Sequence, residues 1–391
     1  PVAAILDRRL TVMLEALMHL RKTGYTEGVA YDGYLLDFLA DWLALLPAAE
    51  RTFFLEHPEF AMQFTESLAL GVPGDAASVA PLSDVEPREM CMHIGAHAKC
   101  HRLKANPALP AYLRRCRLDW QPSQSLAAQR ENIDEGVGAG SKSAKEDATA
   151  GIDAQYALVL RSGSAAEDLA VAMSANRSPM PHMHKDNGTI VIGTRGRWLL
   201  TDPGYQQYLE TSERQFAIGP TAHNVPVVNG EAQVLKKPGE RRVTQVSPGL
   251  WRADVAFSQC YAAALGVTAA RRSVWLAGKQ TVVVADRIGG PGVKTLAWHW
   301  HAHAEAAWSV EGEWAAICVP GVNLWIRSLQ APMEGAAIRR LKGSRGQQTL
   351  IQEIQTPPPV IWWIMAVGDR PPAVRAMGPE RIAVERIEFA L

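Results

Sequence analysis

A β-hairpin is predicted by the stretch Thr189-Ile-Val-Ile-Gly-Thr-Arg-Gly-Arg-Trp-Leu-Leu-Thr-Asp202. Two runs of β-branched and apolar residues flank a Gly-Thr-Arg-Gly turn, which is the pattern of paired antiparallel strands. If the loop has three residues, with Gly196 in the left-handed conformation, Asp202 shares the face of His184. A two-residue loop would place Asp202 on the opposite face.

Histidines lie on both sides of this hairpin. His182 and His184 are two residues apart, so on an extended strand both imidazoles leave the same face. Asp202 ends the return strand, and His223 lies where the next strand is expected to start. Two imidazoles and a carboxylate suit Zn²⁺, which takes nitrogen and oxygen ligands tetrahedrally. The alternative is a group of ordinary surface residues on a sheet, and spacing alone does not decide between the two.

Three regions with different patterns follow one another along the 391 residues. Residues 1–119 show apolar side chains at helical spacing and are predicted to be α-helical, with Leu82-Ser83-Asp84 in a loop between helices. Residues 120–151 are polar and rich in Gly, Ser, Lys and Glu, which predicts a flexible linker or mobile loop. Residues 152–391 contain many short apolar runs broken by Gly and Pro, which predicts an antiparallel β-sandwich. The predicted fold class is therefore α+β and multidomain.

Several motifs together resemble the heparinase II/III-like family of polysaccharide lyases. They are His182-Met-His-Lys-Asp-Asn-Gly188, Asp202-Pro-Gly-Tyr205 and His223-Asn224, which occur in the family's order. Far upstream, Glu27-Gly-Val-Ala-Tyr31 resembles the family's Glu-Gly-x-x-Tyr segment. The family's fold is an incomplete α/α toroid followed by an antiparallel β-sandwich, and its toroid is longer at the amino end than the helical part here. The resemblance therefore implies a shortened toroid, with two explanations: the native protein is longer, or its cleft is reduced.

The resemblance also implies roles for individual residues. Tyr31 would exchange protons, assisted by the active-site histidine His182, in the β-elimination that cleaves a uronic-acid-containing polysaccharide, heparan-like or alginate-like. The residues implied as Zn²⁺ ligands are His184, Asp202 and His223, and those implied to bind substrate are Tyr205, Tyr208 and Arg214. Without the resemblance, Tyr31 would be taken as an aromatic residue on the buried face of a helix.

Two other classes of function compete with the lyase. His182-x-His184-x-Asp186 also resembles the start of the His-x-His-x-Asp-His signature of metallo-β-lactamase-like hydrolases, but Asn187 replaces the final histidine and the alternating αβ layout is absent. The second alternative is a non-catalytic carbohydrate-binding sandwich with structural Zn²⁺. A further histidine group, at 299, 301 and 303, alternates on a predicted strand, and we favour an ordinary sheet face there over a rival metal site.

Composition excludes some partners. The 40 basic and 40 acidic residues balance, so no overall field attracts nucleic acid or a membrane surface. No apolar run reaches the roughly 18 residues of a membrane span. The five cysteines are irregularly spaced, which favours free thiols over a disulfide framework. A local group of cations suits either an acidic polymer or a solvated face: Arg177, Lys185, Arg195, Arg197 and Arg214. The expected location is the periplasm or envelope of a bacterial cell, with the cytoplasm as alternative, and the assembly considered is a homodimer.

Overall fold

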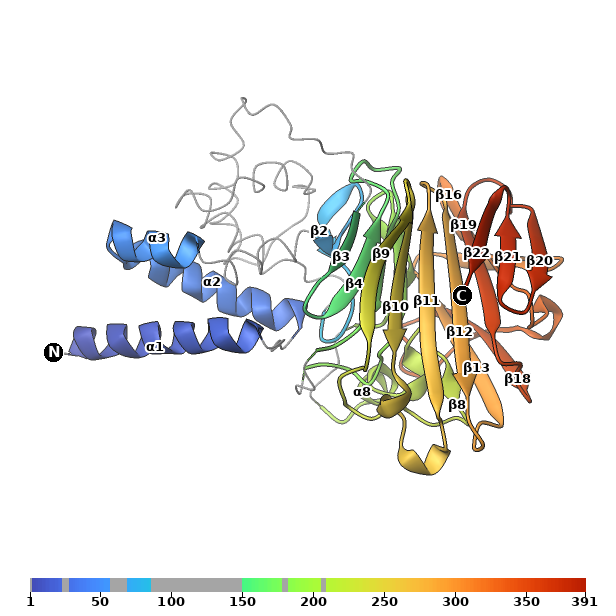
Figure 1. The fold of residues 1–391 in the computed structure, drawn as a ribbon, viewed down its shortest axis with the longest axis horizontal. Coiled ribbons are helices and arrows are strands. Elements are labelled where there is room, and N and C mark those ends of the chain that lie inside the picture. The colour runs from blue at the N-terminus through green and yellow to red at the C-terminus, as the bar shows by residue number, and fades with distance from the viewer. Residues whose placement is uncertain (1, 23–27, 57–68, 86–149, 178–181, 205–208) are drawn as a thin grey trace.

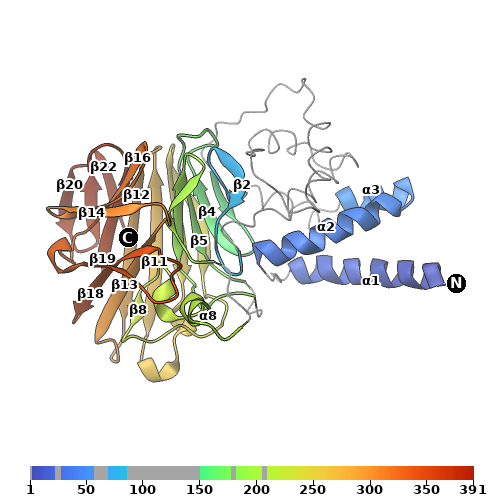
Figure 2. The ribbon, with the colours of Figure 1, turned by 180° about the vertical axis from the view of Figure 1, so that it is seen from behind.

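The computed structural model describes residues 2–22, 28–56, 69–85, 150–177, 182–204 and 209–391. Three helices come first: α1 (Val2–Lys22), α2 (Val29–Leu45) and α3 (Ala48–Glu56). Figures 1 and 2 show them side by side at one end of the molecule, next to the β-sheets. Leu39 and Leu43 of α2 and Phe54 of α3 are buried, as expected for helices that share an apolar face.

A short hairpin follows the helices, which helical spacing does not predict. It consists of β1 (Gly71–Val72) and β2 (Asp75–Val79), joined by Pro73 and Gly74. Gly74 has φ +85, a conformation that a residue without Cβ adopts readily. Leu82, expected between helices, instead comes after this hairpin and packs with Val72 and Val79 against the sandwich. The segment from Ala80 to Val85 is therefore held against the β-sheets.

The remainder of the described chain forms the predicted antiparallel β-sandwich. Its first sheet has nine strands in the order β17-β18-β13-β7-β6-β5-β4-β3, with β8 paired to β13. These strands are β3 (Ala150–Asp153), β4 (Ala157–Arg161), β5 (Ala170–Ser174), β6 (Ile190–Thr194), β7 (Arg197–Thr201), β8 (Val227–Val228), β13 (Thr295–Ala302), β17 (Ala337–Arg340) and β18 (Gln348–Gln355). Because β3 begins at Ala150, the sandwich starts inside the predicted linker, whose residues 120–149 lie outside the described chain.

The second sheet has eight strands in the order β14-β15-β16-β19-β12-β11-β10-β9. These are β9 (Arg241–Ser247), β10 (Leu250–Ala256), β11 (Ala269–Ala277), β12 (Thr281–Gly289), β14 (Ala307–Glu311), β15 (Trp314–Val319), β16 (Val322–Ser328) and β19 (Ile361–Val367). A three-stranded sheet lies at the end of the molecule away from the helices (Figure 1): β20 (Val374–Gly378), β21 (Arg381–Val384) and β22 (Ile387–Ala390).

The core lies between the two large sheets. On β13, Trp298 and Trp300 face inward and contact Trp363 of the opposite sheet, with ring centroids 5.4 and 5.0 Å apart. Their neighbours His299 and His301 consequently leave the outer face of the first sheet. The apolar side chains buried between the two sheets supply the main favourable free energy that holds the sheets together. The free thiols Cys260 and Cys318 make no disulfide, and the other three cysteines lie outside the described residues.

The β6–β7 hairpin differs from its prediction in one detail. The turn has two residues, Arg195 and Gly196, with φ +52 and +73, and the expectation that such a loop places Asp202 on the face opposite His184 is wrong. A bulge between Ile192 and Gly193 shifts the strand register by one residue. Such a shift reverses the face on which each later residue emerges. Asp202 thereby comes out beside His184, as the longer loop would have placed it.

Candidate active site and metal centre

The amino end of α2 is placed against two segments that are far away in the sequence. Gly28 precedes the helix with φ +95, and a Cβ there would lie 3.3 Å from Met183 Sδ and 3.6 Å from Ser83 Cβ. The backbone conformation is the reason for glycine here, because residues with a side chain rarely adopt it, whereas the approach to Met183 is only slightly closer than an ordinary contact. Three positions further on, the ring of Tyr31 stacks on His182, with centroids 3.6 Å apart and planes 14° apart. The two predicted catalytic residues, Tyr31 and His182, are therefore in contact.

His182 and His184 lie in an irregular loop, because β6 begins only at Ile190. The predicted extended strand is wrong here, yet both rings share one partner. His182 Nδ1 donates to Asp84 Oδ2 (3.2 Å), and His184 Nε2 donates to Asp84 Oδ1 (2.9 Å). Since an ionised carboxylate can only accept, both of these ring nitrogens carry the proton.

Asp84 is the residue at this site that sequence reasoning missed. It is 3% exposed and follows Ser83, whose φ of +62 is uncommon for a residue with a side chain. Nothing in the Pro-Leu-Ser-Asp segment distinguishes it from an ordinary acidic loop residue. Its importance comes only from packing, which places it beside two histidines about a hundred residues further along the chain.

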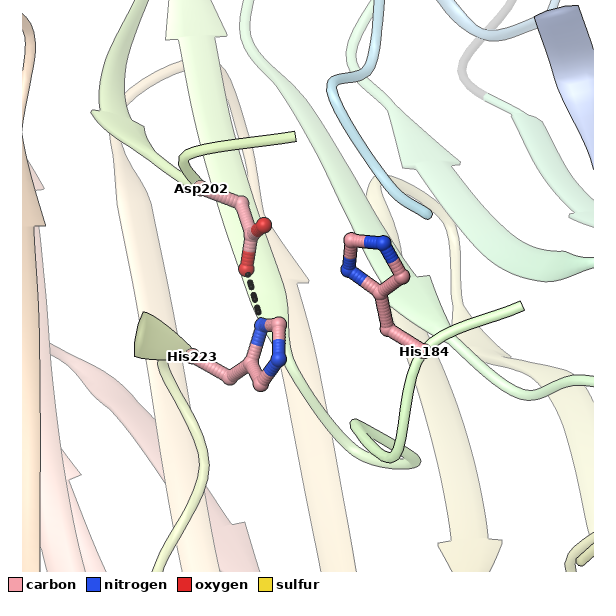
Figure 3. Close-up of side chains that lie close together, drawn as sticks. All are labelled: His184, Asp202 and His223. Carbon is pink, nitrogen blue, oxygen red and sulfur yellow. Dashed lines mark hydrogen bonds and ion pairs between the residues drawn. The ribbon is translucent and has the colours of Figure 1, made fainter. Parts of the chain in front are cut away.

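The three predicted metal ligands do come together. The candidate ligand atoms of His184, Asp202 and His223 all lie within 4.8 Å of one another, and all three residues are buried. Figure 3 shows the two imidazoles facing each other, with the Asp202 carboxylate beside His223. His223 Nδ1 donates to Asp202 Oδ2 (2.9 Å), and the Gly204 amide donates to Oδ1 (3.1 Å).

Two buried ring nitrogens at this cluster have no hydrogen-bond partner within the described residues: His184 Nδ1 and His223 Nε2. The other nitrogen of each ring carries a proton, so these two atoms present lone pairs. A buried lone pair without a partner is unfavourable unless something binds it. The donor set therefore fits a divalent metal cation.

The electrostatics of the cluster also favour a cation. Asp186 accepts from Ser174 Oγ and Asn176 Nδ2 (both 3.1 Å), and burial raises its pKa despite the nearby histidines. Burial alone would lower the pKa of His223, but the charge and hydrogen bond of Asp202, together with Asp186, outweigh it and raise that pKa. The Asp186 shift is mainly the cost of burying a carboxylate, whereas the His223 shift comes from the two carboxylates beside it. A positive group at the cluster would favour the ionised form of both carboxylates.

Asn224 and Arg272 fix the position of His223, and sequence reasoning assigned neither a role. Asn224 donates to the carbonyls of Ile190 (2.9 Å) and Thr201 and accepts from the His301 amide (2.9 Å), which joins three strands. Arg272, from the opposite sheet, donates to the Asn224 and Gly188 carbonyls and pairs with Asp286. Because these groups are buried, each charge needs its ion-pair partner and each carbonyl needs its hydrogen bond, so the whole network holds one arrangement.

The predicted substrate-binding residues are only partly described. Tyr205 and Tyr208 lie outside the described residues. Arg214 lies on α8 (Ser212–Ala217), and its Nε is 3.6 Å from Glu210 Oε1. Of the other predicted cations, Arg177 pairs with Asp153 and Arg197 pairs with Glu305, while Arg195 donates to the Gly321 carbonyl. Lys185 is exposed. Most of this group is thus engaged by neighbouring protein atoms.

The outward histidines of β13 are buried parts of the sheet face. His301 Nε2 donates to the Thr221 carbonyl and the Thr349 hydroxyl donates to His301 Nδ1, both at 3.0 Å. Burial, with the neighbouring His299, lowers the pKa of His301 to about 3, and burial lowers that of His299 to about 4. Among the described residues the only grouping suited to a metal is the His184 cluster.

These two histidines predict a loss of stability in mild acid. Their folded pKa values lie below the ordinary 6.5, so the unfolded chain binds more protons and stability falls as pH drops from about 6.5 towards 4 and 3. Between pH 7 and pH 5 each group should lower the free energy of unfolding by about 2 kcal/mol. Urea unfolding at both pH values measures this, and His301→Gln should reduce the difference. An unchanged pH dependence in that variant would show that His301 is not responsible.

Together the fold and the site define a class: a two-layer antiparallel sandwich, preceded by helices, with a buried histidine and carboxylate cluster beside a stacked tyrosine and histidine. The family model described as Heparinase II/III-like, C-terminal, matches residues 144–358, more than half of the chain. The protein belongs to the heparinase II/III-like family.

Solved structures agree with this fold. The heparan sulfate lyase HepC of Pedobacter heparinus aligns with a TM-score of 0.67 and 14% identity, over 97% of this chain and 60% of its own. A mutant of that lyase aligns with a TM-score of 0.62 and 15% identity, over 85% of this chain and 52% of its own. A heparinase III gene product aligns with a TM-score of 0.59 and 14% identity, over the same shares of the two chains. The chain thus spans 52 to 60% of the length of these proteins. A comparison with curated protein sequences found no match.

Proposed function

We propose that this protein is a lyase that cleaves a uronic-acid-containing polysaccharide by β-elimination. The observation that carries the proposal is the stack of Tyr31 on His182, with His182 bonded to the buried Asp84. A phenol and an imidazole in contact are two groups that can take up and release protons. Two segments about 150 residues apart meet to form this pair, as the family motifs imply.

The chemistry places defined demands on these residues. The C5 proton of a uronic acid is weakly acidic, so a base must remove it while the neighbouring carboxylate is neutralised and an acid protonates the leaving O4. In the proposed mechanism Tyr31 transfers the proton and His182 assists it. A phenol is a poor base unless nearby positive charge favours its ionised form, which an imidazolium at His182 would provide.

We further propose that His184, Asp202 and His223 bind Zn²⁺. The support is the pair of unpartnered buried ring nitrogens and the two buried carboxylates beside them, Asp186 and Asp202. When bound, Zn²⁺ would supply positive charge and a rigid link between the three segments. The residues themselves would then hold the loop after Asp202 and keep His182 oriented beside Tyr31.

The proposed substrate is an acidic polysaccharide of the heparan or alginate type. The neighbouring structures are named as heparan sulfate lyases, which makes a heparan-like polymer the first to test. The helical part would contribute to an α/α toroid. We also propose that the protein is located in the periplasm or cell envelope and that it forms a homodimer. No helix within the described residues is long and apolar enough to cross a membrane.

The test is an ultraviolet assay on a panel of uronate polysaccharides, because β-elimination creates a C4–C5 double bond that absorbs. We expect absorbance to rise with at least one polymer, and the rate to fall after a chelator removes the metal. Polymer cleavage without absorbance would indicate a hydrolase instead. Binding without cleavage, by protein that contains zinc, would favour the carbohydrate-binding alternative.

A further inference from the structure

We propose that Asp84 is a positioning residue that fixes the proton-bearing nitrogen of both His182 and His184, and so links the proton-transfer pair to the metal cluster. The inference rests on the proposed function for its catalytic consequence. Its structural consequence, the position of two imidazole protons, does not depend on lyase activity. Both bonds reach the same buried carboxylate, at 3.2 and 2.9 Å.

The consequence for His182 concerns its second nitrogen. Because Nδ1 donates to Asp84 Oδ2, the neutral ring carries its lone pair on Nε2. Nε2 is therefore the atom that can take up and return a proton. Without a carboxylate at Nδ1, the ring could adopt the other tautomer and lose that ability. A buried carboxylate that holds an imidazole in one tautomer is worth a large factor in catalysis, about 10⁴-fold in serine proteases.

The consequence for His184 concerns the metal cluster. Nε2 donates to Asp84 Oδ1, which leaves the lone pair on Nδ1, the buried nitrogen without a hydrogen-bond partner in the described chain. A carboxylate that binds the far nitrogen of a ligating histidine fixes its tautomer and orientation. Asp84 therefore prepares His184 to bind a metal on the face shared with Asp202 and His223.

The segment around Asp84 is well held for this task. The Asp84 amide donates to the His182 carbonyl (3.3 Å), and the Ser83 hydroxyl donates to Met183 Sδ (3.7 Å). The flanking Leu82 and Val85 are buried in the apolar cluster on the outer face of the first sheet. The carboxylate thus sits on a fixed backbone, as a positioning residue requires.

Asp84→Asn is the informative variant, because an amide of the same shape has one accepting oxygen and one donating nitrogen. Only one histidine can keep its bond, and the other faces a donor. We expect kcat to fall by about 10²- to 10⁴-fold with little change in KM, and zinc affinity to fall by about 10- to 100-fold. Asp254→Asn is the matched control, since Asp254 is also buried but accepts from Arg252 and Ser273 in the second sheet.

Two readouts are independent of activity. Nitrogen-15 spectra of labelled histidines in the zinc-loaded protein report which ring nitrogen carries each proton, and titration with zinc alone gives the affinity. We expect the Nδ1-protonated form for His182 and the Nε2-protonated form for His184, with Asp254→Asn unchanged. The opposite tautomer of either ring in the wild-type protein would overturn the proposal, even if Asp84→Asn did not fold. So would unchanged tautomers and zinc affinity in a folded Asp84→Asn protein.

A retained carboxylate provides a further check. Asp84→Glu should keep both tautomers and recover more zinc affinity than Asp84→Asn. Zinc affinity in Asp84→Glu as low as in Asp84→Asn would contradict a role through the carboxylate. If the wild type cleaves no polymer, the proposed lyase function fails, while the tautomer and zinc results still decide the role of Asp84.

Discussion

The Tyr31→Phe variant is expected to cleave the polysaccharide about 10³-fold more slowly than the wild type, within the range of about 10²- to 10⁴-fold that a general acid or base contributes. The substitution removes the phenol oxygen but keeps a ring that can stack on His182. The effect should therefore fall on kcat, because the group is needed during proton transfer and not to shape the site. Initial rates of ultraviolet absorbance at several substrate concentrations separate kcat from KM.

A matched control is Tyr261→Phe. The Tyr261 hydroxyl donates to the Pro226 carbonyl (2.7 Å), and its removal should lower stability by about 1 kcal/mol without changing the rate. If Tyr31→Phe keeps more than a tenth of the wild-type kcat, Tyr31 is not the proton-transfer residue. An equal loss in both variants would indicate general damage to the fold.

The His223→Ala variant is expected to lose at least about 10²-fold in zinc affinity, more than the 10- to 100-fold usual for a partner of a ligating histidine. The ring supplies one of the two unpartnered nitrogens, and its loss also removes the hydrogen bond to Asp202. Since a ligand that binds only the folded state stabilises it, a chelator should lower the Tm of the wild type. In His223→Ala the chelator should have almost no effect.

His301→Gln is the control for this experiment, because His301 is also buried but both of its ring nitrogens have protein partners. It should bind zinc as the wild type does and respond to the chelator in the same way. Unchanged zinc binding by His223→Ala would place the metal elsewhere. A wild type that binds no zinc, with Tm unaffected by the chelator, would contradict the proposed metal site altogether.

Local patterns were sufficient for much of this protein. Short runs of β-branched and apolar residues broken by Gly and Pro predicted the sandwich and the β6–β7 hairpin, because such residues suit the buried, pleated surface of a strand. The order of the motifs predicted that His184, Asp202 and His223 meet, and the structure brings them together. A two-residue hairpin loop was expected to place Asp202 on the opposite face, because the bulge between Ile192 and Gly193 depends on how the strands pack and has no local signal.

The sequence by itself therefore determined the strands and the sandwich, which follow from apolar runs and turn chemistry. Through the order of its motifs it also determined the residues of the cluster. Only the tertiary structure placed Asp84 between His182 and His184 and stacked Tyr31 on His182. These contacts join segments from about 100 to 150 residues apart, and each depends on apolar packing such as that of Leu82 on the sheet. Which distant segments come into contact depends on how the whole chain buries its apolar surface, and a local sequence pattern does not contain that information.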